Sequence, residues 1–244
     1  GSDAVRYWAA SARLGTDAAF DEGQMKIGRR LAIKLLNAAR FALTFELPAG
    51  VSEVSEPVDR AMLAALRKQV AVATKAFDEY DHTKALETTE TFFWTFADDF
   101  VELVKERAYG QGDFTTAQVG SAVLALREAL SVMVRLFAPF IPYAAEEVWS
   151  WWQAGSVHLA PWPTDSELSH YENSDLYELA SAALILVRKT KSDAKLSMKA
   201  EIKTATLTGA KELELIAEDL KSVGKIADLK LLIGNEFALS DLEF

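Results

Sequence analysis

Basic side chains, an amide and an aromatic ring recur through residues 26–41 at a spacing that suits an anionic partner. The stretch from residue 26 to residue 45 holds five cations and no acidic residue. At about 100° per residue of an α-helix, seven side chains fall within an arc of roughly 140°: Lys26, Arg29, Arg30, Lys34, Asn37, Arg40 and Phe41. Arginine can donate paired hydrogen bonds to a phosphate or a base edge, and an exposed phenylalanine can stack on an unpaired base. Single-stranded RNA loops offer both features, so this face is a candidate RNA-binding surface.

The same face has a second interpretation, as a solvated surface whose cations pair with a neighbouring acidic helix. Residues 78–106 hold nine acidic residues against Lys84 and Lys105. Runs of charge usually solvate a helix, and an aromatic residue such as Phe41 at the edge of an apolar face often belongs to the core. The pattern alone leaves both interpretations open.

A second basic cluster spans residues 188–203, where six cations face Asp193 and Glu201. The cluster follows a predicted helix C-terminus, a place where cations are favoured by the helix dipole in any case. Its first three cations are further RNA-binding candidates, with a purely structural role as the alternative: Arg188, Lys189 and Lys191.

Catalytic and metal-binding arrangements are not indicated. The absence of cysteine excludes disulfides, thiolate zinc sites and cysteine nucleophiles. Three histidines are present, with no pair at ligand spacing: His82, His158 and His170. The carboxylate pairs Asp98–Asp99 and Glu146–Glu147 are adjacent on predicted helices, so each pair diverges by about 100°. We therefore expect no catalytic residue, no metal site and no cofactor in this chain.

Long amphipathic helices must position the candidate residues. Apolar residues recur at spacings of three and four along residues 22–45, which indicates one buried face: Ile27, Leu31, Leu35, Ala38, Ala42 and Phe45. The same periodicity, with prolines and glycines as breakers, predicts helices over residues 3–12, 22–45, 57–80, 84–108, 116–137 and 143–152.

The pattern changes near residue 155. The remaining chain predicts a helix over residues 175–190, strands over 200–207 and 227–232, a helix over 211–222 between them, and a short strand at 237–239. The fold class is therefore mainly α: an antiparallel helical bundle with a small C-terminal α+β subdomain. The expected divisions are a bundle over residues 21–153, a linker over 154–173 and the α+β subdomain over 174–244.

Composition bounds the possible partners. The chain has 244 residues, of which 50% are hydrophobic and 25% charged, typical of a globular protein. A net charge of −10 argues against a general nucleic-acid binder, so positive charge for RNA must be local. No apolar run reaches the roughly 18 residues of a membrane span, and residues 1–8 lack the pattern of a signal peptide. We expect a cytoplasmic location and no membrane partner.

Several blocks resemble the valyl members of the class I aminoacyl-tRNA synthetases. They occur in the family's order and cover most of the chain, while the C-terminal α+β part matches less distinctly. Residues 1–8 are similar to the helix after the KMSKS loop of the synthetases for aliphatic amino acids. The valyl-like blocks are Arg13–Asp17 with Phe20–Glu22, Lys34–Phe41, Leu136–Pro142 with Glu146–Trp149, and Val157–Pro163.

The resemblance implies an anticodon-binding helical bundle, preceded over residues 1–20 by the end of a stem-contact region. It implies that Lys34, Asn37, Arg40 and Phe41 meet the anticodon loop of a valine tRNA. The parent enzyme would use ATP to attach valine to that tRNA. No HIGH-type motif, nucleotide-binding glycine loop or editing domain is recognisable, so we expect a non-catalytic, monomeric fragment whose partners are tRNA and the catalytic domain of the same chain.

Two positions depart from the family pattern. Ala138 stands where a histidine is usual, and Asp99 stands where an aromatic residue is common. Both suggest variation in packing. Two other functions stay open: the equivalent domain of an isoleucyl or leucyl relative, and an acidic helical module that binds a protein partner.

Overall fold

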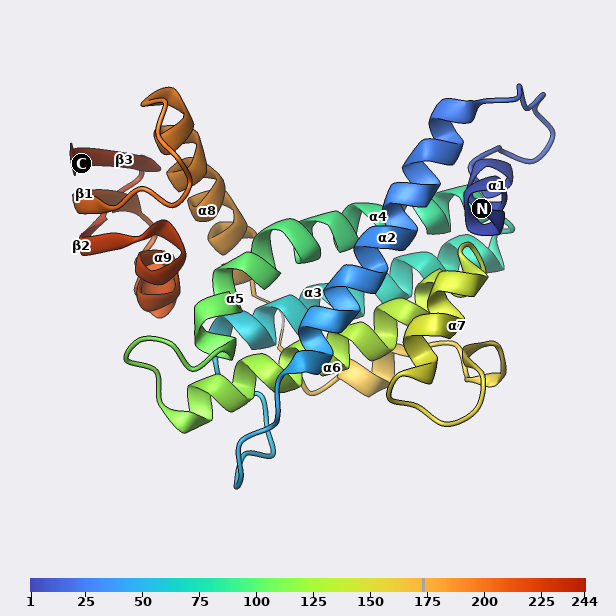
Figure 1. The fold of residues 1–244 in the computed structure, drawn as a ribbon, viewed down its shortest axis with the longest axis horizontal. Helices are drawn as coiled ribbons and strands as arrows, with labels where there is room; N and C mark the ends of the chain where they lie inside the picture. The colour runs from blue at the N-terminus through green and yellow to red at the C-terminus, as the bar shows by residue number, and fades with distance from the viewer. Residues whose placement is uncertain (173) are drawn as a thin grey trace. The chain divides into compact units, whose positions relative to one another are not determined.

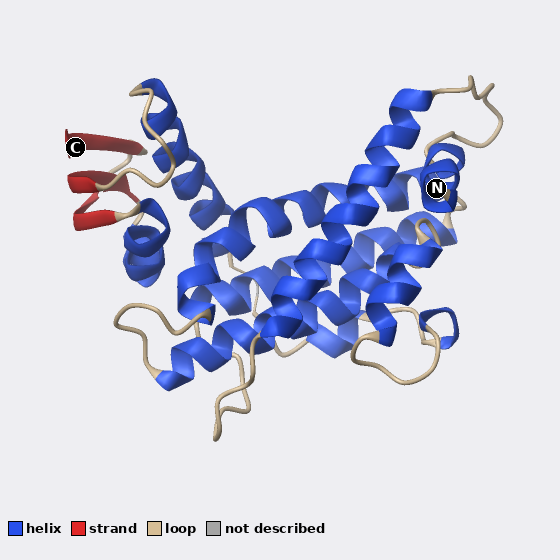
Figure 2. Cartoon of the chain, viewed as in Figure 1, coloured by secondary structure: helices blue, strands red, loops and turns tan. Residues whose placement is uncertain are grey.

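The computed structural model describes residues 1–172 and 174–244, and it is mainly helical with a small sheet near the C-terminus (Figures 1 and 2). Asn173, the last residue of the predicted linker, lies outside the described residues. The mainly α fold class with a small C-terminal sheet is confirmed. The chain forms two compact units: unit 1 holds residues 1–46, 63–97 and 125–171, and unit 2 holds residues 47–62, 98–124 and 172–244.

Most predicted helices are present within a few residues of their expected bounds. The helices are α1 (Ser2–Ala10), α2 (Glu22–Thr44), α3 (Pro57–Asp78), α4 (His82–Thr95), α5 (Val101–Ala108), α6 (Thr116–Phe137), α7 (Pro142–Ser150), α8 (Leu176–Asp193) and α9 (Ala217–Gly224). A π-helical turn, Phe96–Phe100, joins α4 to α5, so the helix predicted over 84–108 is interrupted. The helix predicted over 211–222 is also divided, into a 3-10 segment, Lys211–Ile216, followed by α9.

Helix α2 shows how unit 1 is built. Leu31, Leu35 and Ala42 are buried, which confirms these positions of the predicted apolar face. At Gly28 the helix meets α1 so closely that an added Cβ would lie 2.4 Å from the Cβ of Tyr7. A side chain at position 28 would therefore push α1 away. Figure 1 shows α1 beside the first turns of α2.

Three hydrogen bonds tie α1 to the start of α7 and to the loop before it within unit 1. The Asp3 carboxylate accepts hydrogen bonds from the backbone N–H groups of Tyr143 (3.1 Å) and Ala144 (2.8 Å), which otherwise lack helical partners. Arg6 donates from Nη2 to the carbonyl of Pro139 at 2.9 Å. These contacts fix α7, whose C-terminal end carries Trp151.

The residues predicted as a linker are anchored in unit 1. Arg135 of α6 forms a 2.6 Å ion pair with Glu167, and the Trp162 indole donates to Thr74 of α3 at 2.9 Å. Arg67 donates to the carbonyls of Ser169 and Tyr171. Residues 162–171 thus contact α3 and α6 in this unit.

Unit 2 contains a three-stranded sheet in the order β2-β1-β3. Strand β1 (Ile202–Gly209) pairs in parallel with β2 (Ile226–Ile233) and antiparallel with β3 (Ala238–Glu243). The connection from β1 to β2 passes through α9, as a parallel pair requires. The small core joins α8 to the sheet through Val187, Ile202, Ala205 and Ile226.

A buried charge cluster holds α9 in unit 2. Arg107 of α5 is 1% exposed and donates paired hydrogen bonds to Asp59 of α3, both at 2.8 Å. Its other edge pairs with Asp219 of α9 at 2.9 and 3.1 Å. Ser121 of α6 also donates to Asp59 at 2.7 Å. Four helices therefore meet at one guanidinium group.

Candidate nucleic-acid interface

The structure places the seven candidates of α2 on the side opposite its buried face. Five are exposed and two, Lys34 and Phe41, are half-buried. The exposed residues are Lys26, Arg29, Arg30, Asn37 and Arg40. Helix α2 therefore presents a ridge of cations together with one amide and part of one ring.

Both ends of α2 are fixed by side chains. At the N-terminus Asp21 accepts from the backbone N–H groups of Gly23 (2.6 Å) and Gln24 (3.3 Å), and a carboxylate there also favours the helix dipole. At the C-terminus Arg127 of α6 donates to the carbonyl of Phe45. The ridge is thus carried by a helix that is capped at one end and tied to α6 at the other.

Two arginines of the ridge lie over tryptophan rings. The Arg40 guanidinium carbon is 5.5 Å from the ring centroid of Trp151, and that of Arg30 is 5.8 Å from the ring centroid of Trp94. Attraction between a cation and the electron-rich face of an indole operates within about 6 Å. Trp94 belongs to α4 and Trp151 follows α7, so the two rings come from two different segments that pack beside α2.

Four cations of the ridge are not paired with the acidic residues 78–106 in the part of the chain that the structure describes. Within residues 1–172 and 174–244, none of the four cations Lys26, Arg29, Arg30 and Arg40 forms an ion pair. The interpretation of α2 as a face paired with the acidic residues 78–106 therefore does not describe these four side chains.

Phe41 has a divided environment. Its ring packs edge-on against Phe45, with centroids 4.9 Å apart and planes at 81°, and Phe45 is itself buried. Phe41 is half-buried, so part of the ring is accessible. The side chain contributes to packing and can also offer a surface to a base.

The second basic cluster has a different environment. Arg188 donates from Nη1 to Asp99 at 2.7 Å and from Nη2 to the carbonyl of Asp98 at 2.6 Å. Lys191 is 1% exposed, and its ammonium donates to the carbonyls of Met198 (3.0 Å) and Ala200 (2.7 Å). Burial, with a smaller repulsion from Lys225, lowers the pKa of Lys191. Of the three candidates only Lys189 is exposed, and Arg188 and Lys191 are not part of the interface that we propose.

The two departures from the family pattern have different explanations. Ala138 is 8% exposed and packs at the end of α6, as expected for a change in packing. Asp99 instead accepts hydrogen bonds from Arg188 and from the hydroxyl of Ser181. The expectation of a simple packing change was wrong for Asp99, because a carboxylate in the π-helical turn binds α8 through polar contacts.

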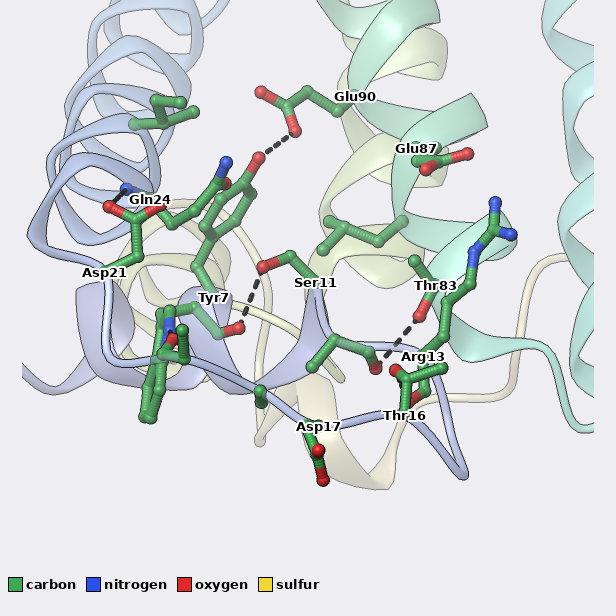
Figure 3. Close-up of a pocket in the computed structure, with 16 residues that line it drawn as sticks. Tyr7, Ser11, Arg13, Thr16, Asp17, Asp21, Gln24, Thr83, Glu87 and Glu90 are labelled. Atoms are coloured by element: carbon green, nitrogen blue, oxygen red, sulfur yellow. Dashed lines mark hydrogen bonds between the residues drawn. The ribbon is translucent and has the colours of Figure 1, made fainter.

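A pocket of about 700 Å³ lies among α1, the loop after it, α2 and α4. Figure 3 shows Tyr7 of α1 reaching Glu90 of α4, to which its hydroxyl donates at 2.5 Å. Burial, reinforced by this bond and by the charges of Glu90 and Glu87, raises the pKa of Tyr7. Four carboxylates and one arginine line the pocket: Asp17, Asp21, Glu87, Glu90 and Arg13. Its negative lining does not suit RNA.

Sequence reasoning missed the two tryptophans beside α2. A signal does exist, because each follows a glutamate by four residues on a helix, a spacing that brings the side chains together. Trp94 donates from its indole N–H to Glu90 at 3.0 Å, and Trp151 donates to Glu147 at 3.1 Å. What the sequence does not reveal is that both rings reach arginines of α2.

The described residues, 1–172 and 174–244, include neither a metal-binding cluster nor a membrane-spanning helix. In this part of the chain no group of three or more histidine, aspartate or glutamate side chains could hold a metal ion. None of the described helices combines the length and apolarity needed to cross a membrane.

The sequence matches the family described as the anticodon-binding domain of tRNA ligase, over residues 59–206. It is 54% identical to the valine–tRNA ligase of Leifsonia xyli, over 99% of this chain and 29% of that protein. It is 55% identical to the valine–tRNA ligase of Thermobifida fusca, over 93% of this chain and 26% of that protein. It is 47% identical to the valine–tRNA ligase of Cutibacterium acnes, over 100% of this chain and 28% of that protein.

These alignments set the scope of the likeness. The chain spans only 26 to 29% of the length of these relatives. Helix α2 precedes the residues matched by the family, but the alignments with the Leifsonia and Cutibacterium proteins include nearly all of this chain. A solved LeuRS-tRNA-LeuAMS complex of Agrobacterium radiobacter covers 96% of this chain and 29% of its own, with a TM-score of 0.47 and 14% identity.

Proposed function

Since the chain belongs to the family of anticodon-binding domains of tRNA ligases, we propose that it binds the anticodon stem-loop of a valine tRNA on the exposed ridge of α2. The alignments with three valine–tRNA ligases support the choice of amino acid. The family match and the chemistry of α2 support RNA as the partner.

One observation carries the proposal: within the described part of the chain, the four ridge cations Lys26, Arg29, Arg30 and Arg40 form no ion pair although the protein's net charge is −10. Leaving such cations in solvent on an acidic protein concentrates positive potential in one place. Arginine suits phosphates and base edges, because its planar group donates paired hydrogen bonds. The accessible part of Phe41 adds a stacking surface of the kind that unpaired bases use.

The role of the whole ligase is part of the same proposal. We infer that the anticodon arm is held here while a catalytic domain beyond this chain uses ATP to attach valine to the acceptor end. The contacts of α2 would then select the tRNA and set its position, and no residue of this chain would take part in the chemical step. A monomeric state and a cytoplasmic location belong to this proposal as well.

The test is a titration of the chain with an in vitro transcript of valine tRNA and with the same transcript carrying a changed anticodon. We expect tighter binding of the valine transcript, because base edges in the loop would meet Asn37 and Arg40. Equal affinity for both transcripts would contradict anticodon recognition.

Salt dependence distinguishes RNA binding from a protein-interaction role. For contacts with single-stranded RNA, each neutralised phosphate contributes a slope of about −0.7 to the logarithm of affinity against the logarithm of salt. Several contacts on α2 would therefore give a steep decline. Binding that is flat in salt would indicate an apolar interface and contradict the proposal.

A further inference from the structure

The two tryptophans that flank α2 share one arrangement. In each, an indole N–H donates to the glutamate one helical turn earlier, and the face of the same ring carries an arginine of α2. One set consists of Glu90, Trp94 and Arg30, and the other of Glu147, Trp151 and Arg40. They come from segments that are far apart in the sequence, α4 and the end of α7.

In each set the arrangement restricts the conformations of both the tryptophan ring and the arginine side chain. A hydrogen bond at the indole N–H fixes the direction of the ring, and the ring face then favours one position of the guanidinium group. Arginine loses considerable rotamer freedom when it is bound, so holding the side chain in place before binding removes part of that cost. Arg30 and Arg40 are about 15 Å apart along the axis of α2, since ten residues separate them.

We propose that Trp94 and Trp151 are positioning residues of the RNA-binding face, which hold the guanidinium groups of Arg30 and Arg40 ready for an RNA loop. This inference rests on the proposed function. Neither ring has to touch RNA, because its effect passes through the arginine above it. Trp151 offers the clearer test, since Glu90 beside Trp94 also accepts the hydroxyl of Tyr7.

The first experiment measures the affinity of the chain for the valine tRNA transcript after changes at Trp151. We expect Trp151→Leu to weaken binding about 3-fold to 5-fold, the range of an exposed cation–π contact. Trp151→Phe keeps an aromatic face and should stay within about 2-fold of the parent chain. Trp152→Leu is the matched control, because Trp152 packs on Trp149 with centroids 5.5 Å apart and should not affect affinity.

The second experiment repeats Trp151→Leu in an Arg40→Ala background. If the ring acts only through Arg40, the second substitution adds no further loss. A loss of the same size in both backgrounds would make Trp151 an independent contact or a general structural residue, and would overturn the inference. A thermal midpoint for each variant shows that the folded chain is being compared.

The third experiment changes Glu147, where simple electrostatics and positioning predict opposite signs. Removing a carboxylate near bound RNA should tighten binding if charge alone matters. We expect Glu147→Ala to weaken binding about 2-fold, because the indole loses its hydrogen-bond acceptor, an effect within the range of one cation–π contact. Glu147→Gln keeps an acceptor without the charge and should bind more tightly than Glu147→Ala. Equal or tighter binding by Glu147→Ala than by the parent would overturn the inference, even if Trp151→Leu does not fold.

Arg40→Ala distinguishes a failure of the proposed function from a failure of the positioning role of Trp151. If it leaves affinity unchanged, the proposed function of the α2 ridge is contradicted. If Arg40→Ala weakens binding and Trp151→Leu does not, the ridge binds RNA and only the positioning role of the tryptophan is overturned.

Discussion

Basic side chains have opposite surroundings on α2 of unit 1 and around Arg107, Arg188 and Lys191 of unit 2. On α2 in unit 1 the arginines are exposed and two of them rest on tryptophan faces. In unit 2 Arg107 and Arg188 pair with aspartates, and the ammonium of Lys191 binds two carbonyls. Both regions look basic along the sequence. The difference lies in whether other segments of the chain supply the counter-groups.

This contrast separates a binding surface from a structural contact. An exposed cation over an aromatic ring keeps its N–H groups available to a partner, whereas a cation enclosed by carboxylates or carbonyls has already used them. Substitutions in unit 2 should therefore lower stability, and substitutions on the α2 ridge should lower RNA affinity. The expected effects below decline in size.

The largest effect is expected for Arg107→Met. It leaves Asp59 and Asp219 buried without their counter-charge, a change that costs about 3–5 kcal/mol. Urea unfolding at neutral pH measures the loss. Arg29→Met on the ridge is the matched control and should change the free energy of unfolding by less than about 0.5 kcal/mol. Similar losses for both variants would remove the distinction between the regions.

Lys191→Met should also act on stability. The methionine keeps the apolar stem, but the carbonyls of Met198 and Ala200 lose their donor, which costs about 1–3 kcal/mol. We expect the affinity for the valine tRNA transcript to stay the same. A variant of full stability with weakened RNA binding would place Lys191 in the RNA-binding surface after all.

Arg40→Ala should lower RNA affinity and not stability, whereas Arg188→Ala should lower stability and not RNA affinity. Arg40→Ala is expected to weaken RNA binding about 10-fold, or about 1.4 kcal/mol, with little change in stability. Arg188→Ala removes the pair with Asp99 and should lower stability by about 1 kcal/mol while RNA affinity holds. Affinity titrations measure RNA binding by both variants, and urea unfolding measures their stability. Loss of RNA affinity in Arg188→Ala would contradict the contrast between exposed and paired arginines.

The smallest effect concerns pH. Burial, opposed by Arg107 and reinforced by Asp59 and Glu56, raises the pKa of Asp219 from 3.8 to about 6. A folded-state pKa above the unfolded value means that protonation favours the folded state, so this contribution is complete below about pH 4 and is lost as the pH rises through 6. The stability of the parent relative to Asp219→Asn should therefore fall between about pH 4 and pH 6. An unchanged difference would contradict this environment for Asp219.

Periodicity was sufficient to predict most helices. The helix predicted over residues 22–45 is observed as Glu22–Thr44, because its apolar residues repeat with the helical period and Pro48 ends the pattern. The π-helical turn Phe96–Phe100 was not predictable, since the apolar stripe continues through it. The division of the helix predicted over 211–222 was not predictable either, because the sequence has no glycine or proline where the 3-10 segment ends and α9 begins at Ala217.

The candidate site was predictable as a pattern but not in its surroundings. The arc on α2 follows from helical geometry, so the exposed cations could be listed from spacing alone. Whether the acidic residues 78–106 pair with these cations, and whether Trp94 and Trp151 approach them, depends on contacts between distant segments. The roles of Arg188 and Lys191 were hidden for the same reason, because Asp99 lies 89 residues before Arg188 and Lys191 binds carbonyls of a loop.

Nucleotide-resolved footprinting of the valine tRNA transcript tests the central claim most directly. The chain should protect nucleotides of the anticodon loop from cleavage, and Arg40→Ala should remove that protection while Arg188→Ala keeps it. Protection confined to other parts of the tRNA, or protection of the loop that persists in Arg40→Ala, would contradict a role for the α2 ridge in binding the anticodon.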